Sequence, residues 1–497
     1  MTNIEFELEK FLKSRQKPTL EFSFPLSAYS SAEDVIQDYL DIYCDKNNKW
    51  TQIWTKHYLS FIFECFEEAK SGSCLSIITD CMSKIRNLFA DYRNELLVTY
   101  PLDVLLMVIL LARISGNTTA KDIVNYYRKH CLELVILIPG MPNLHHQLSV
   151  TTVNTALANI DAGEVRKFFS AYFSKIVIGL KERIGYHDDR IQYREDNLKD
   201  TYAFDGQEQV SSYKKGTENR RVKGAQIVSL ADCTNQGIID YIAVDKKNNE
   251  KTACLELFFN TVIKDKVIMS DALNTQSSVT DQILESGADY LMPIKANGNK
   301  ELKLHVEAIF NREHKHSAKV TSEPLKDHGR VEEYAYEILP AQEYLDHRIK
   351  NQHKKVNTLV KYHKKVTSLI DGNVKGQSDS TRYYISSLEY NEKTIAQVKA
   401  SIEDYWFIEE HHSIIDDPLI FDQDNLHGCI PNTLSNNAGL NKIGFNILGF
   451  IRQKLTKERN LKTPIPYKSV EKELAAMSIF ELLPLLNEYW FSNTEDC

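Results

Sequence analysis

The chain lacks several features that would assign it to a class of protein at once. Its nine cysteines are scattered and no Cys-x-x-Cys pair occurs, so the sequence supports neither a zinc ribbon nor a disulfide framework, and we expect a reducing compartment. The opening residues, MTNIEFELEK, are acidic and do not follow the pattern of a secretory signal peptide. Internal repeats and low-complexity segments are also missing.

A long apolar run and an excess of positive charge are missing too. The longest apolar run, about residues 104–112, stops at Arg113, is too short to span a bilayer, and predicts a buried helix without membrane association. The net charge is -8, so any surface that binds nucleic acid must be local, or an acidic site must be offset by metal. With 42% hydrophobic residues over 497 positions, the composition predicts a globular protein of two to four domains.

The first 195 residues carry mostly helical signals. We expect a helical extension over residues 1–80 and a helical, DNA-binding domain over residues 81–195. In the second segment, Pro101 stands near a helix start and Gly116 follows the helix end. The stretches TTAKDIVNYYRKH and LSVTTVNTALANID both begin with Ser or Thr caps. They fit either a helix-turn-helix or an ordinary helical hairpin.

Residues 196–300 change to strand-like patterns with helices between them. Three consecutive strands followed by alternating helix and strand predict an α/β fold with a ribonuclease-H-like catalytic domain, which residues 391–460 would complete. Residues 301–390 predict a mixed, β-rich insertion, in which GNVKGQSDS (residues 372–380) is typical of an exposed loop. Residues 461–497 predict a C-terminal helical tail.

Three acidic residues are the main candidates for chemistry. Asp205 in YAFDGQ and Asp271 in KVIMSDALNTQ each end a short apolar, strand-like run. A glutamate follows in the helix-like DYWFIEEHH, either Glu409 or Glu410. Carboxylates at neighbouring strand ends and on a facing helix can hold two Mg²⁺ or Mn²⁺ ions about 4 Å apart for phosphoryl transfer. Because adjacent helical residues point about 100° apart, only one of the two glutamates can face such a site.

The residues around these carboxylates resemble the insertion-sequence DDE transposases, in particular the ISAs-type, H-repeat-associated branch. The resemblance rests on Asp-Gly at Asp205, on the DA…Q pattern that begins at Asp271, and on GADYLMPIKAN after it. Further on it rests on HGRVE, TRYYISSL and Trp406-Phe407-Ile408-Glu409, which matches the family's W-x-I-E signature. It covers about residues 80–460. It implies a DNA transposase that cuts element ends and joins 3′ hydroxyls to target DNA, with Asp205, Asp271 and Glu409 binding Mg²⁺ or Mn²⁺.

The sequence departs from the family pattern near the third carboxylate. Gln207 replaces the usual Lys after Asp-Gly, Glu403 replaces a basic residue six positions before the glutamate, and Glu410 replaces an Asn. The usual LHW becomes HHS, and the Y-x-x-R…E…K signature of hairpin-forming relatives is absent. We expect these changes to alter DNA contacts rather than metal binding.

The resemblance also implies partners: terminal inverted repeats, target DNA, and a second copy of the chain, because two ends must be cut and joined. The implied location is the cytoplasm, with the nucleoid, in a bacterium, or the nucleus in a eukaryote. Hydroxyl groups at helix starts and nearby basic side chains are the candidate DNA contacts. These are Lys121, Arg128, Lys129, Thr151, Thr152, Lys214, Lys215, Lys295, Lys300, His328 and Arg330.

Two other functions compete with transposition. A domesticated transposase-derived protein would bind DNA without cutting it, and a stand-alone metal-dependent nuclease would cut without joining strands. Inverted repeats flanking the gene would favour the transposase.

Overall fold

The computed structural model describes most of the chain from Ala32 onward and divides it into two compact units. The ranges described are 29, 32–44, 47–48, 57–62, 64, 74–93, 97–174, 198–209, 226–244, 250–312, 314, 317–322, 324–327, 330–347, 353–370, 373–391, 393–423, 426, 431–461 and 463–491. One unit joins residues 1–169 to residues 417–497, and the other comprises residues 170–416. None of the described helices is long and apolar enough to cross a membrane.

The second unit is built on a ten-stranded mixed sheet in the order β3-β2-β1-β4-β5-β10-β9-β8-β6, with β7 paired to β8. The first three strands are antiparallel, whereas β4 runs parallel to both β1 and β5. The strands are β1 Thr201–Glu208, β2 Gln226–Asp232, β3 Gly237–Val244, β4 Val267–Ser270, β5 Asp289–Ile294, β6 Ala318–Thr321, β7 Leu325–Asp327, β8 Arg330–Pro340, β9 Thr358–Ile370 and β10 Asn373–Ser386. These strands include the five predicted over residues 196–300.

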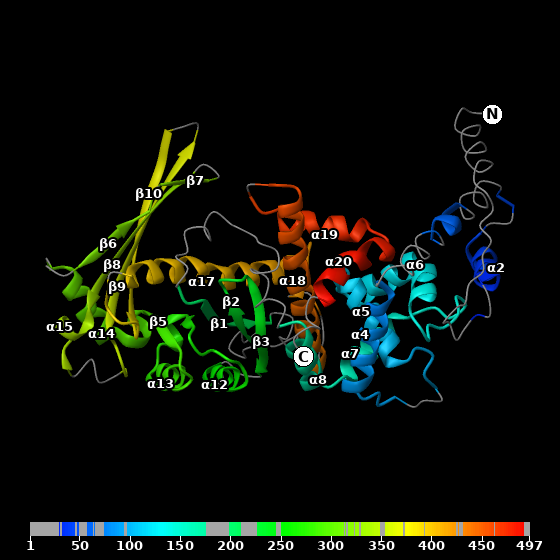
Figure 1. Ribbon diagram of the computed structural model, residues 1–497, viewed down its shortest axis with the longest axis horizontal. Helices are drawn as coiled ribbons and strands as arrows, with labels where there is room; N and C mark the ends of the chain where they lie inside the picture. Colours follow the sequence, from blue (N-terminus) through cyan, green and yellow to red (C-terminus); the bar gives the residue numbers. More distant parts are fainter. Residues whose placement is uncertain are drawn as a thin grey trace, which may run out of the picture. The chain divides into compact units, whose positions relative to one another are not determined.

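Helices cover both faces of this sheet, as the two-residue period of the strands requires (Figure 1). On one face, Phe204 and Ile268 pack against apolar residues of three helices. On the other face, Val267 and Met269 pack against a long helix that crosses the sheet. The three helices on the first face are α12 Glu250–Asn260, α13 Ser277–Glu285 and α14 Ala296–Phe310, and the crossing helix on the other face is α17 Thr394–Asp416. Two short elements complete the unit: the helix α15 Ala341–Tyr344 and the 3₁₀ turn η4 Ala272–Asn274.

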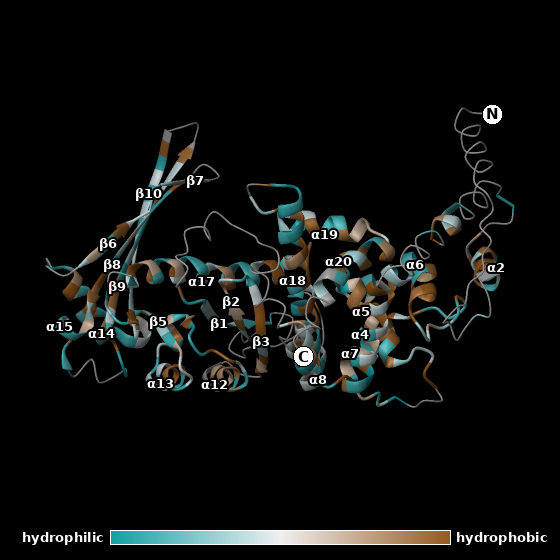
Figure 2. Cartoon of the chain, in the orientation of Figure 1, coloured by the Kyte–Doolittle hydropathy of each residue, from teal (hydrophilic) through white to brown (hydrophobic). Residues whose placement is uncertain are grey.

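Strands β8, β9 and β10 extend beyond the core as an arm (Figure 1). The prediction of a loop over residues 372–380 is wrong, because residues 373–380 lie in β10 and pair with β9. Residues 374–382 are exposed, and Figure 2 shows mainly hydrophilic and intermediate colours along this stretch of β10. A strand that is exposed to solvent on both faces does not alternate apolar and polar residues, so this segment lacks the sequence pattern of a strand. Gly376 also adjoins a shift in the β9–β10 register, and glycine is typical of turns.

The first unit is helical. Its elements are α2 Ala32–Tyr43, α4 Cys74–Leu88, α5 Leu102–Ile114, α6 Ala120–Leu137, α7 Val150–Asn159, α8 Ala162–Tyr172 (whose last residues lie beyond the unit boundary), α18 Pro431–Glu458, α19 Tyr467–Ala476 and α20 Ile479–Phe491. The predicted catalytic domain joins residues 196–300 to residues 391–460, and residues 461–497 are predicted to form a helical tail. In the structure the boundary falls at Asp416, α18 packs against α5 and α7, and α20 packs against α4.

A buried arginine joins α5 to α18. Every residue of α5 is buried, and Arg113 near its C-terminus is 1% exposed. Its two terminal nitrogens donate to the side-chain oxygens of Asn437 and Asn441. Burial lowers the pKa of the guanidinium to about 9, which keeps it protonated at neutral pH. Within the described ranges no carboxylate forms an ion pair with it, so neutral amides solvate this charge.

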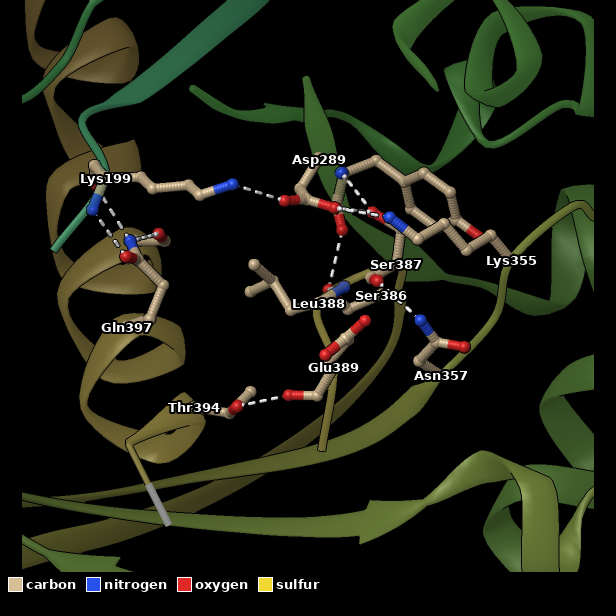
Figure 3. Close-up of polar contacts among 12 residues, drawn as sticks. Lys199, Asp289, Lys355, Asn357, Ser386, Ser387, Leu388, Glu389, Thr394 and Gln397 are labelled. Atoms are coloured by element: carbon tan, nitrogen blue, oxygen red, sulfur yellow. Dashed lines mark hydrogen bonds and ion pairs between the residues drawn. The ribbon is translucent and has the colours of Figure 1, made fainter. Parts of the chain in front are cut away.

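A polar network fixes the N-terminal end of α17 to the sheet (Figure 3). Gln397 accepts from the Lys199 backbone N–H at 2.7 Å and donates to the Lys199 carbonyl at 2.9 Å. Lys199 Nζ in turn lies 2.7 Å from Asp289, which also accepts from Ser387 Oγ at 2.7 Å. Burial raises the pKa of the Asp289 carboxyl, but bonds from Lys199 and Ser387 and the charge of Lys355 outweigh it, so the net pKa is lowered.

We expect Asp289→Asn to lower the free energy of unfolding by about 1–3 kcal/mol at pH 7. A carboxyl whose pKa is lower in the folded state stabilises the fold above its unfolded pKa, about 3.9, and loses that contribution as the pH falls through the folded value. Urea unfolding between pH 2.5 and 7 should therefore show a flatter acid limb for the variant. Glu333→Gln is the control, because its ion pair with Lys365 is exposed and should contribute less than about 1 kcal/mol. An unchanged acid limb in Asp289→Asn would contradict this assignment.

Candidate functional site

Asp205 and Asp271 lie beside each other on neighbouring strands. β1 and β4 pair in parallel with Phe204 opposite Ser270, so the next residue on each strand is one of the two aspartates. Strands so paired are about 4.8 Å apart. Asp205 shares the sheet face of Thr201 and Gln207, both of which contact α17. The register therefore places the backbones of the two residues at adjacent positions. Asp205 lies inside β1, which continues to Glu208, whereas Asp271 directly follows β4.

Helix α17 lies along β1 and points one face at it. Thr201 donates to Ser401 at 2.8 Å near one end, and Gln207 donates to Asp416 at 2.5 Å near the other. The six strand steps between Thr201 and Gln207 span about 20 Å, and the fifteen helical steps from Ser401 to Asp416 span about 22 Å. The two elements therefore stay in register over their whole contact.

His412 and Tyr405 lie on this same face, because residues 401, 405, 408, 412 and 416 recur at helical spacing. His412 Nδ1 is 3.7 Å from Asp205 Oδ2, and the buried His411 packs edge-on against the His412 ring. Glu409 follows Tyr405 by one helical turn.

The charges of the three predicted carboxylates all act on the phenol of Tyr405. Burial raises the pKa of its phenol far above the ordinary value, and the charges of Asp205, Asp271 and Glu409 raise it further. Glu409 also raises the pKa of Tyr384 on β10, where burial is the larger cause. Tyr405 therefore stays protonated and can donate a hydrogen bond toward the acidic residues.

The donor set fits a hard divalent cation in its chemistry. Asp271 Oδ1 caps the η4 turn by accepting from the N–H groups of Leu273 and Asn274 and from the Asn274 side chain, which leaves Oδ2 for a ligand. Asp205 Oδ1 accepts from the Gly206 N–H at 2.9 Å. Among the residues that the structure describes, no three carboxylate, histidine or cysteine side chains converge closely enough to hold one ion. Side-chain rotation would have to bring the carboxylates together.

Two departures from the family pattern have packing roles. Gln207, 7% exposed, donates to Asp416 and to the His412 carbonyl, and so fastens the C-terminal part of α17 to β1. Glu403 accepts a hydrogen bond from Tyr336 of β8 at 3.2 Å. Both side chains therefore hold α17 in place.

The predicted DNA contacts are distributed over both units. In the helical unit, α6 exposes Lys121, Arg128 and Lys129, although Lys129 Nζ donates to the Ala475 carbonyl. Thr151 and Thr152 lie in the first turn of α7, where Ser149 caps the Thr152 N–H. In the sheet unit, Lys295 and Lys300 are exposed around the start of α14, and Arg330 is exposed at the start of β8. Lys214, Lys215 and His328 lie outside the described residues.

Tyr405 and Arg382 were not among the candidate residues predicted from the sequence. The four-residue spacing between Tyr405 and Glu409 places both on one helix face and was a readable signal. Arg382 lies within TRYYISSL, but Lys364 and Trp406, which lie near it, come from another strand and from α17, and no local pattern indicates that proximity.

Comparisons with known proteins give distant relatives. No family model matches the chain. It is 26% identical over 370 residues to "H repeat-associated putative transposase YhhI" of Escherichia coli (strain K12), covering 73% of this chain and 88% of that protein. "Putative protein YbfL" of the same strain has the same identity and coverage. "H repeat-associated putative transposase YbfD" is 28% identical over 249 residues, 50% of this chain and 88% of that protein. Among solved structures, a piggyBac transposase synaptic complex with hairpin DNA aligns over 88% of this chain and 83% of that chain, at 11% identity and a TM-score of 0.33.

We expect Gln207→Leu to destabilise the sheet unit by about 1–3 kcal/mol, because it removes a hydrogen bond to a carboxylate. Gln207→Lys should keep most of the stability, since an ammonium group can also donate to Asp416. Urea unfolding of the two variants measures the difference. Equal losses in both would show that side-chain shape, and not donation to Asp416, matters at this position.

Proposed function

We propose that this chain, a distant homologue of the H-repeat-associated transposases, is a metal-dependent DNA transposase that cuts element ends and joins their 3′ hydroxyls to target DNA. The observation that carries the proposal is the placement of Asp205 on β1 beside Asp271 after β4, with α17, which bears Glu409, packed along β1. The motifs that first suggested the family include all three.

The topology supports a ribonuclease-H-like assignment for residues 201–294 together with α17. An antiparallel β3-β2-β1 sheet continued by parallel β4 and β5, with helices on both faces, agrees with the predicted α/β layer. In this arrangement the rigid sheet holds two carboxylates and the crossing helix supplies the third. The site therefore depends on how α17 seats on β1.

Mg²⁺ or Mn²⁺ would bind to Asp205, Asp271 and Glu409. Such ions activate the attacking oxygen and stabilise the leaving oxygen in phosphoryl transfer. The chain's own groups would position the ligands: the η4 turn orients Asp271, and the Gly206 N–H orients Asp205. Of the two adjacent glutamates we choose Glu409, because its charge acts on Tyr405 together with the two aspartates.

DNA is the proposed partner, and we propose that the helical unit binds it. Lys121 and Arg128 are exposed on α6, and the first turn of α7 exposes Thr151. Two copies of the chain would act together, one active site for each end, as joined ends require. A protein–DNA complex with one copy per pair of ends, weighed by mass photometry, would be inconsistent with that stoichiometry.

We expect Asp205→Asn, Asp271→Asn and Glu409→Gln each to reduce Mg²⁺-dependent cleavage of cognate ends by at least about 10³-fold, while DNA binding persists. Losing a metal ligand removes several kcal/mol of transition-state stabilisation, and each 1.36 kcal/mol is tenfold in rate. Glu410→Gln is the matched control, since it changes the neighbouring carboxylate on the same helix. A gel-based cleavage assay on end-containing duplexes measures the rates.

A second readout tests the metal site without catalysis. Because the ions bind the folded state, Mn²⁺ should raise the melting temperature of the wild type and of Glu410→Gln, but much less that of Glu409→Gln. If Glu410→Gln lost both cleavage and the Mn²⁺ shift while Glu409→Gln kept them, the glutamate assignment would be reversed. Binding of ends without cleavage would instead identify a domesticated binding protein, and cleavage without joining would identify a nuclease.

A further inference from the structure

A group of basic and aromatic side chains lies on the arm beside the acidic site. It consists of Tyr334 on β8, Lys364 on β9, Arg382 on β10 and Trp406 on α17, and we call it the basic–aromatic cluster. Tyr334 lies opposite Lys364, and Lys364 lies opposite Ser380. Arg382, two residues beyond Ser380, therefore shares the sheet face of Lys364 and is its diagonal neighbour.

Both cations of the cluster lie over the Trp406 ring. The guanidinium carbon of Arg382 is 5.7 Å from the ring centroid, and Lys364 Nζ is 5.5 Å from it. Lys364 is also 5.3 Å from the Tyr334 ring and 2.9 Å from Glu332. These distances are within the range of cation–π attraction, which is strongest on the face of a tryptophan. The ring therefore holds two positive charges near one point.

The cluster borders the proposed metal ligands. Trp406 precedes Glu409 by three residues, so the two side chains are neighbours on the helix surface. The Tyr384 hydroxyl lies close enough to both Arg382 and Glu409 for the two charges to act on it in opposite directions. Arg382 and Glu409 therefore both lie near the Tyr384 hydroxyl.

Arg382 is the member best placed to take a ligand. It is exposed, and Trp406 is 39% exposed, so both can be reached from solvent. Lys364 already forms its ion pair with Glu332, whereas no carboxylate in the described part of the chain pairs with Arg382. One donor of Arg382 bonds to the Tyr384 hydroxyl, and a guanidinium over a ring can direct its other in-plane N–H groups, in the forked geometry that matches a phosphate, at a ligand.

We propose that Arg382, oriented by Trp406 and assisted by Lys364, binds a backbone phosphate of the DNA strand that enters the acidic site. A phosphate is favoured over a base stacked on Trp406, because the two cations already occupy positions over the ring. The inference rests on the proposed function, since it assumes that DNA is the substrate. Trp406 acts here as a positioning residue, and Lys364 adds positive charge.

The test measures DNA affinity against salt. A fluorescein-labelled 30-base-pair duplex is titrated in Mg²⁺ with protein that carries Asp205→Asn, which keeps the DNA intact, from 50 to 200 mM KCl. Adding Arg382→Ala should weaken binding about fivefold to tenfold and reduce the slope of log K against log salt by about one, as the loss of one phosphate contact does. Melting temperatures of all variants check that each is folded.

Lys365→Ala is the matched control, because the next residue on β9 points to the opposite face and pairs with Glu333. It should leave affinity and slope unchanged. Arg382→Lys should keep the slope and recover part of the affinity. Trp406→Phe should keep more DNA affinity than Trp406→Leu, because phenylalanine retains an aromatic ring beneath the guanidinium. In protein that already carries Arg382→Ala, Trp406→Leu should reduce the affinity little further.

The outcomes separate this inference from the proposed function. If Arg382→Ala matched Lys365→Ala in affinity and slope, the phosphate site would be overturned, even where the wild type cleaved DNA. If Arg382→Ala reduced affinity and slope as expected, but the wild-type protein never cut DNA in Mg²⁺ or Mn²⁺, the phosphate site would stand and the transposase proposal would fail.

Discussion

The seating of α17 on β1 is the interaction on which the rest of the sheet unit depends. Thr201, Asp205 and Gln207 meet Ser401, His412 and Asp416 in one order along both elements. A helix rises about 1.5 Å per residue and a strand about 3.3 Å, so this match holds only for a fixed number of residues on each side. One residue inserted into α17 before Glu409 would turn that side chain by about 100°. The third carboxylate is therefore positioned by the anchors at both ends of the helix, including the Gln397 and Asp289 network.

The acidic site and the arm have complementary charges. Asp205, Asp271 and Glu409 all place negative charge near Tyr405, and it is this charge that the proposed divalent cations would offset. Arg382 and Lys364 place positive charge over the ring of Trp406, which precedes Glu409 by three residues on α17. In the proposed function this charge would attract the DNA backbone toward the acidic residues. A net charge of -8 is compatible with DNA binding when basic residues are concentrated in this way.

The sequence predicted the elements of the sheet unit better than their assembly. Strands β1 to β5 follow from apolar runs. Asp271 directly follows β4 as predicted, whereas Asp205 lies inside β1, which continues to Glu208 beyond the apolar run. The outer half of β10 was mistaken for a loop because it is exposed on both faces and has no periodicity to detect. The sequence analysis did not anticipate α14, whose first turn contains Gly298 and a non-helical Asn299.

Contacts between distant segments were beyond the sequence. Gln207 and Glu403 were interpreted as lost phosphate contacts, whereas Gln207 bonds to Asp416 and Glu403 to Tyr336. In the helical unit, α18 and α20 pack against helices that precede the sheet in the chain, and no local sequence pattern predicts this packing. Within this unit, the side-chain amides of Asn437 and Asn441 accept hydrogen bonds from the buried, positively charged Arg113, and no carboxylate of the described residues pairs with it. A carboxylate introduced on α18 in place of either asparagine would form an ion pair with this arginine, whereas a lysine introduced there would be repelled by it.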